Sequence, residues 1–193
     1  MNVVQVIAAK TMERSSDFAD FRARYHERLT ALTRVQNLLS RLADGARINF
    51  DDLILSEIKS LDGNAAKVTL EGPKGVALRS STVQTFALAL HELSTNAVKH
   101  GAYSQPQGRL EVRWRLDHAS DGQPWLHVDW RERGVRVSKN AAVDGGAGRE
   151  LIERALPYQL GAKTTFVVEE DGVHCTISLP TSERQRVRGN ANV

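Results

Sequence analysis

The chain has 193 residues, of which 41% are hydrophobic and 25% are charged, so it is long enough to bury a core as one domain with an appended segment. Its 26 basic and 23 acidic residues nearly cancel, to a net charge of +3, whereas a nucleic-acid-binding surface needs clustered basic residues. The one basic cluster lies in a C-terminal segment, 182–193, that is typical of a disordered tail: Arg184, Arg186 and Arg188. The composition therefore argues against a nucleic-acid-binding protein.

A single cysteine excludes an internal disulfide framework and fits a reducing compartment. Cys175 alternates with Val173 and Ile177, and we expect it to be a buried strand residue and not a nucleophile. The sequence has neither a signal peptide nor a long apolar segment. We therefore expect a soluble, cytoplasmic polypeptide, with any membrane or sensory part lying outside it.

Two helices are predicted in the N-terminal part. The first spans about 2–11, and the turn at 15–17 supplies an N-cap for the second. The second is a long amphipathic helix over 16–42, with apolar residues at a spacing of three to four: Phe18, Phe21, Tyr25, Leu29, Leu32, Val35, Leu39 and Leu42. This face can pack on its own domain, or it can form a helical hairpin in a bundle.

After a break at 44–45, helices and strands alternate. We expect helices at 50–58, 81–100 and 149–159, and strands at 67–70, 109–116, 125–130, 164–169 and 173–179. Helices packed on one face of a mixed sheet make an α/β sandwich.

The most informative segment is 91–101, which reads His-Glu-Leu-Ser-Thr-Asn-Ala-Val-Lys-His-Gly. On a helix, Glu92, Asn96 and Lys99 share one stripe. A carboxylate, an amide and an ammonium suit a magnesium–nucleotide complex, because oxygen ligands bind Mg²⁺ and a point charge binds phosphate. The opposite stripe is apolar: Val83, Phe86, Leu90, Leu93 and Ala97. Taken alone, such a helix is more often a solvated surface face.

A second signal follows in the strand at 126–132. Its apolar residues alternate onto one face, and Glu132 continues that face just before Gly134. A carboxylate at this position can accept a hydrogen bond from an exocyclic amine such as adenine N6. The alternative is a solvated acid at an ordinary strand end.

A third signal is the glycine-rich turn Asp-Gly-Gly-Ala-Gly at 144–148, which opens an apolar-periodic helix. Bare backbone N–H groups at a helix start favour a phosphate oxyanion. Such turns often merely start helices. Three signals in this order nevertheless support one another.

Together these segments resemble the ATP-binding half of a bacterial sensor histidine kinase of the HWE family. That family is named for a histidine in the helix motif and a Trp-x-Glu in the next motif, which in this chain are His91 and Trp130 with Glu132. The stretch 146–152 is similar to its glycine box, and 172–180 resembles its closing strand. The resemblance covers most of 1–180. One departure is that the family's next Gly and Pro are replaced by Val135 and Arg136.

The resemblance implies the ATP-binding fold that histidine kinases share with gyrase-type ATPases. It implies a dimerisation hairpin at 1–45, whose first helix is truncated, an ATP-binding domain at 46–181 and a tail at 182–193. It also implies ATP and Mg²⁺ as cofactors, a homodimer and a response-regulator receiver domain as partner.

The resemblance further implies roles for the motif residues in phosphoryl transfer. Asn96 would ligate Mg²⁺, Lys99 and His100 would contact phosphate, and Glu132 would select adenine. The full set expected to bind the nucleotide is Asn96, Lys99, His100, Trp130, Glu132, Gly134, Gly146, Gly148 and Leu151. Trp130 would act as a packing wall of the pocket.

Two further residues are candidates for catalysis. Glu92 is placed one turn before Asn96 to orient a water or the attacking imidazole as general base. His91 points about a hundred degrees away on the helical wheel. It is either functional or a histidine that holds the helix against the sheet.

The family's usual phosphoacceptor histidine is expected about two turns upstream of Met1. In the family a His-Arg-x-x-Asn box precedes an apolar stretch similar to 3–8, and this chain begins immediately before that stretch. We therefore expect no self-phosphorylation on that histidine. His26 lies in a context that resembles the family's second helix, and we interpret it as a bundle or surface residue.

Three functions are compatible with the sequence. The leading one is the catalytic core of a two-component histidine kinase, which passes phosphate from ATP to histidine and then to a response-regulator aspartate. The second is a stand-alone ATP-binding protein kinase or anti-sigma-like switch. The third is a nucleotide-free phosphotransfer scaffold, against which the intact set of Glu92, Asn96, Glu132 and Gly148 argues.

Overall fold

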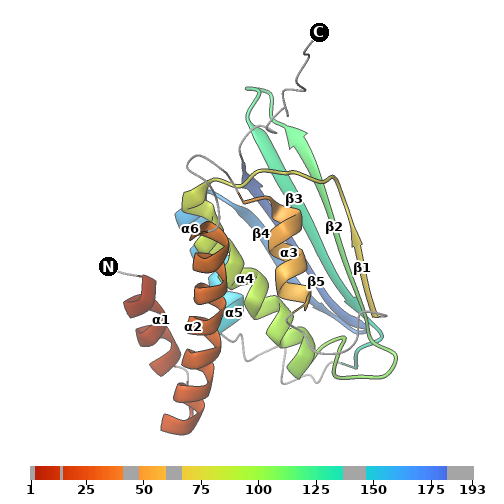
Figure 1. Cartoon of the computed structure of the whole chain (residues 1–193). Helices are drawn as coiled ribbons and strands as arrows, with labels where there is room; N and C mark the ends of the chain where they lie inside the picture. The colour runs from red at the N-terminus through yellow and green to blue at the C-terminus, as the bar shows by residue number, and fades with distance from the viewer. Residues whose placement is uncertain (1–2, 14, 41–47, 60–66, 137–146, 182–193) are drawn as a thin grey trace.

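The computed structural model describes residues 3–13, 15–40, 48–59, 67–136 and 147–181. A five-stranded sheet carries helices on one face (Figure 1). Its order is β1-β2-β3-β5-β4, with β1 parallel to β2 and the other pairs antiparallel. The strands are β1 (Val68–Glu71), β2 (Arg109–His118), β3 (Pro124–Arg133), β4 (Lys163–Glu169) and β5 (Gly172–Pro180). The predicted α/β sandwich with a mixed sheet is confirmed.

The helices also follow the predicted order. They are α1 (Val3–Met12), α2 (Phe18–Ser40), α3 (Phe50–Lys59), α4 (Ser80–Lys99), α5 (Ala147–Glu150) and α6 (Leu156–Leu160). A π-helical turn, η2 (Leu151–Ala155), joins α5 to α6, so the helix predicted at 149–159 is one run with a π turn inside it. Within the described part of the chain, no helix combines the length and apolar character that a membrane span requires.

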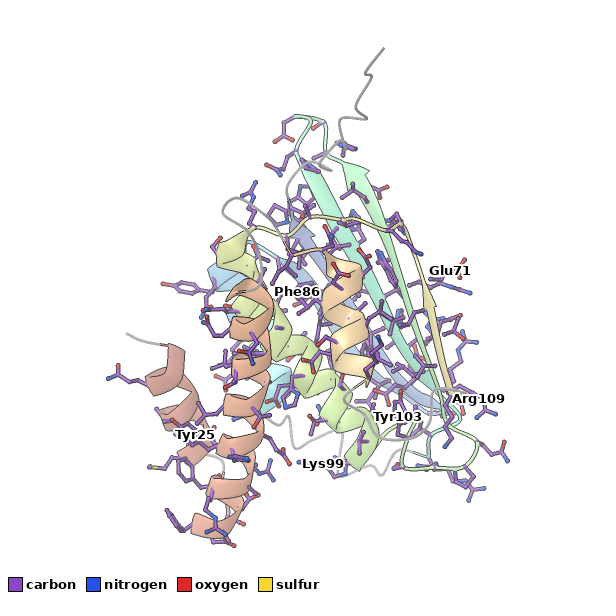
Figure 2. The ribbon with its side chains drawn as sticks, viewed as in Figure 1. Tyr25, Glu71, Phe86, Lys99, Tyr103 and Arg109 are labelled. Atoms are coloured by element: carbon purple, nitrogen blue, oxygen red, sulfur yellow. The ribbon has the colours of Figure 1, made fainter. Side chains whose placement is uncertain are left out.

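The apolar stripe predicted on the motif helix, α4, is its buried side. Its members are each at most 1% exposed: Val83, Phe86, Leu90, Leu93 and Ala97. Phe86 lies in the interior (Figure 2), and its ring stacks on that of Phe50 from α3, 5.6 Å between centroids. Phe50 in turn meets Trp114 of β2 edge-on at 5.2 Å. This aromatic series fixes α4 and α3 on the sheet and leaves the polar stripe of α4 on its other side.

The long helix α2 lies along α4 (Figure 1). Ala31 and Leu32 of α2 and Leu88 of α4 form a small buried cluster, with Tyr25, Leu29 and Leu151 packed around it. This stretch of α2 therefore packs on its own domain. At the N-terminal end of the same helix, Phe18 is 76% exposed.

Some predicted features lie outside the described residues. They are the break at 44–45, the glycines at 145 and 146, and the tail at 182–193. The side chains at 35 and 39, and residue 42, also lie outside the described part of the predicted apolar face of α2.

Cys175 is a fully buried residue of β5, paired with Trp130 of β3, as the sequence predicted. Burial raises the pKa of its thiol to about 12, so the reactive thiolate is scarce at neutral pH. We expect a thiol reagent to label Cys175 at least roughly a hundredfold more slowly in native buffer than in concentrated urea. Mass spectrometry after timed quenching would measure both rates. Equal rates would contradict the buried position.

Candidate nucleotide-binding site

The start of α5 lies directly against the polar stripe of α4. A Cβ placed on Gly148 would lie 2.9 Å from Glu92 Oε2 and 3.4 Å from Asn96 Nδ2, so only glycine allows this approach. The glycine box and the helix motif, far apart in the sequence, therefore meet. A carboxylate, a side-chain amide and bare backbone are brought together as the sequence predicted.

Two consecutive residues of α2 pair with the same stripe. The Arg28 Nε–H donates to Glu92 Oε1 over 2.6 Å, and its Nη1 donates to Thr11 Oγ1 of α1 over 2.6 Å. Lys99, near the C-terminal end of α4 (Figure 2), donates to both carboxylate oxygens of Glu27, at 2.9 and 3.1 Å. Neither ion pair was predicted from the sequence. The sequence does contain the complementary charges. Glu27 and Arg28 are adjacent on α2, and each has the opposite charge to its partner on α4.

The two ion pairs differ in burial. The side chains of Arg28 and Glu92 are 11% and 14% exposed, whereas those of Lys99 and Glu27 are 44% and 41% exposed. Because water screens the second pair much more, it contributes little to stability, while the first is a largely desolvated contact.

Trp130 and Glu132 share the inner face of β3, because residues two apart on a strand point the same way. The Trp130 indole N–H donates to Glu132 Oε1 over 3.0 Å. The backbone N–H of Ala102, just beyond α4, donates to Glu132 Oε2 over 2.7 Å. Trp130 is completely buried and Glu132 is 3% exposed. Trp130 is therefore a hydrogen-bond donor to the carboxylate, a role that was not predicted from the sequence.

Within the described part of the chain, the Glu132 carboxylate accepts hydrogen bonds from an indole and a backbone N–H and from no cationic side chain. Burial raises the pKa of Glu132 above its usual value, and the hydrogen bonds from Trp130 and Ala102 partly oppose this. A Cβ on Gly101 would collide with Glu132 Oε2, so the glycine that ends the helix motif lets the chain turn tightly against the carboxylate. Glu132 therefore joins the end of α4 to the sheet.

The turn after α4 is tied to the motif residues. The Asn96 carbonyl accepts hydrogen bonds from the N–H groups of His100 and Gly101, over 2.8 and 3.0 Å. The His100 side chain is exposed at this end of the helix. The turn thus connects the helix motif to the backbone N–H of Ala102 that holds Glu132.

His91 lies on a different side of α4 from Glu92. It is 9% exposed, and its Nδ1 lies 3.3 Å from Glu57 Oε2 of α3. The structure does not bring it to Gly148. This position favours the interpretation that His91 holds the helix, although its partner is α3 and not the sheet.

Two other predicted residues determine the backbone conformation and the packing around the site. Gly134 has a φ of +69°, and a Cβ there would collide with the Gln107 carbonyl oxygen, so glycine is required after Trp-x-Glu. Leu151 is partly buried and packs against both the main hydrophobic core and the small cluster of Ala31, Leu32 and Leu88. Gly146 lies outside the described residues.

Among the described residues, no three His, Cys, Asp or Glu side chains are grouped so as to hold a metal ion. The side-chain amide of Asn96 offers an oxygen of the kind that Mg²⁺ accepts as a ligand.

Comparison with known proteins finds similarity to histidine kinases. The model of the family described as HWE histidine kinase matches residues 1–74. The chain is 32% identical over 190 residues to blue-light-activated histidine kinase 1 of Erythrobacter litoralis (strain HTCC2594), and 27% identical over 183 residues to a blue-light-activated histidine kinase of Rhizobium johnstonii. Each match covers 94% of this chain, which spans 49% and 50% of the two relatives, about half their length.

The fold is also that of a solved histidine kinase structure. The histidine kinase domain from the Erythrobacter litoralis EL346 blue-light-activated histidine kinase superposes with a TM-score of 0.57 and 19% sequence identity. The superposition covers 94% of both chains. At this identity the likeness establishes the fold.

Proposed function

Because the chain belongs to the HWE histidine kinase family, we propose that it binds Mg-ATP and transfers the γ-phosphoryl group to a histidine. The phosphoryl group then passes to an aspartate of a response-regulator receiver domain. The observation that carries this proposal is the contact of Gly148 with Glu92 and Asn96. A nucleotide-free scaffold has no need of such an approach of bare backbone to a carboxylate and an amide.

The described residues fit a bound Mg-nucleotide in the following way. Asn96 offers an oxygen ligand to Mg²⁺, and Lys99 exchanges Glu27 for a phosphate oxygen, with His100 beside it. The metal would supply charge neutralisation at the phosphates. Glu132 accepts the adenine amine, and Gly148 gives the phosphates access to the helix start. Phosphoryl transfer depends chiefly on such positioning and electrostatic stabilisation.

Glu92 is the general base of the proposed reaction. Arg28 bonds its Oε1, and its Oε2 is the oxygen that faces Gly148. Oε2 is therefore the atom that would accept a proton from a water or an imidazole at the nucleotide.

The proposal includes the assembly and location of the protein. The exposed aromatic end of α2 at Phe18 supports pairing of the α1–α2 hairpin with a second copy in a homodimer. A response-regulator receiver domain would be the second partner, and both proteins would act in the cytoplasm. A sensory domain outside this chain would supply the signal.

The first test is the affinity for Mg-ATP, measured by calorimetry. We expect wild type to bind, and Asn96→Ala to bind at least about tenfold more weakly, because the variant loses a metal ligand. Asn37→Ala, an exposed position on α2, is the matched control and should bind like wild type. Absence of binding by wild type, or equal affinity of Asn96→Ala, would show the site assignment to be wrong.

A further inference from the structure

The carboxylate of Glu132 accepts one hydrogen bond at each oxygen, from donors that the fold holds rigidly. We propose that Trp130 is a positioning residue for base selection, and that its indole N–H fixes the Glu132 carboxylate in the orientation that receives the exocyclic amine of adenine. This inference rests on the proposed function, in which Glu132 meets the base.

The geometry gives Trp130 a specific task. The terminal torsion of a glutamate is broad, so the carboxylate plane turns freely unless its oxygens are held. Ala102 holds Oε2 at 2.7 Å, and Trp130 holds Oε1 at 3.0 Å. A carboxylate oxygen has two lone-pair directions, so each oxygen keeps a direction for a further donor. Two fixed donors therefore fix the direction of the remaining lone pairs.

The indole itself is held by the sheet. Trp130 is completely buried, and its neighbours across β3 are Val112 of β2 and Cys175 of β5. The indole N–H therefore already points to Glu132 before a nucleotide binds. Trp130 loses no further side-chain freedom on binding. Preorganisation of this kind lowers the entropic cost of binding.

Selectivity follows from the donor and acceptor pattern. An oriented carboxylate accepts a hydrogen bond from a base that carries an amine and so favours its binding. It disfavours a base that presents a carbonyl oxygen, because two acceptors then face each other. A carboxylate free to turn would discriminate less. Removal of the indole N–H should thus reduce the preference for adenine and not only the overall affinity.

The experiment compares Mg-ATP with Mg-purine riboside triphosphate, which lacks the amine, by calorimetry on the full chain. We expect wild type to prefer ATP by about tenfold or more. In Trp130→Phe we expect ATP affinity to fall about tenfold, with the analogue little changed, so that the preference largely disappears. If Trp130→Phe does not fold, benzothienylalanine at position 130 keeps the indole shape and removes only the N–H.

Trp114→Phe is the matched control. The Trp114 indole N–H donates to the Pro73 carbonyl over 2.9 Å, so this variant loses an equivalent bond on the same sheet and should keep the wild-type preference. If wild type itself shows no preference, the role of Glu132 in the proposed function fails, and the inference fails with it. If wild type prefers ATP and the Trp130 variant does so equally, the inference is overturned while the proposed function stands.

Discussion

Replacing Gly101 by alanine should lower the free energy of unfolding by about 3–5 kcal/mol. The new Cβ would collide with Glu132 Oε2 and lie 2.8 Å from Ala97 Cα, so either the helix end or the carboxylate must move. Moving the carboxylate also breaks its bond to the Ala102 N–H, which leaves a buried donor unpaired. Urea unfolding followed by circular dichroism would measure the loss.

Gly122→Ala provides the control for this prediction. Gly122 has a φ of +81°, and a Cβ there meets nothing within 4 Å, so alanine should cost only about 1–2 kcal/mol of backbone strain. Gly101 has no such positive φ, and its penalty comes from contacts. In a Glu132→Ala background part of that penalty should vanish. A penalty at Gly101 no larger than that at Gly122 would show that the carboxylate is not held there.

Local periodicity predicted most of the fold. The apolar stripe of α4 followed from a helical spacing that tertiary contacts did not override, and each of its five residues is buried. The strands were predicted from alternation, and Trp130 and Glu132 share a face because the period of a strand is two. The meeting of Gly148 with Asn96 is different. Spacing cannot predict a contact between distant segments, and that expectation came from the order of the motifs.

The contacts that were missed are those between side chains of different elements. Arg28 and Glu92 pair because α2 packs on α4 in one particular position along its length, which amphipathicity does not determine. The predicted face of α2 identified the side that packs, but not which charges would meet there. For the same reason, the sequence did not identify Glu57 as the neighbour of His91.

The hydrogen bond from Trp130 to Glu132 could have been predicted from the sequence. Residues two apart on one strand face are close enough for an indole N–H to reach a carboxylate, and both were assigned to the same face of β3. The burial of Glu132 could not be predicted from the sequence, because a carboxylate at a strand end is usually solvated. Burial makes the bond necessary, since a carboxylate taken out of water must be hydrogen-bonded.

Replacing Arg28 by alanine should weaken the attachment of α2 by about 2–4 kcal/mol, slightly less than for a fully buried pair because both partners keep some exposure. The variant leaves a largely desolvated Glu92 without its Arg28 partner, and it also removes the bond to Thr11 of α1. Amide hydrogen exchange in α2 should therefore quicken about 30-fold or more, while exchange in β3 and β5 stays near wild type.

Glu27→Gln is the matched control, one residue away on the same helix. Its side chain and that of Lys99 are far more exposed than those of Arg28 and Glu92, so loss of this pair should cost about 0–1 kcal/mol and change exchange in α2 little. Arg28→Ala combined with Glu92→Ala should recover part of the loss, because the stranded charge is then gone. Equal effects of Arg28→Ala and Glu27→Gln would contradict the role of burial. In that case the apolar cluster at Leu32 and Leu88, and not the ion pair, would account for the position of α2 on α4.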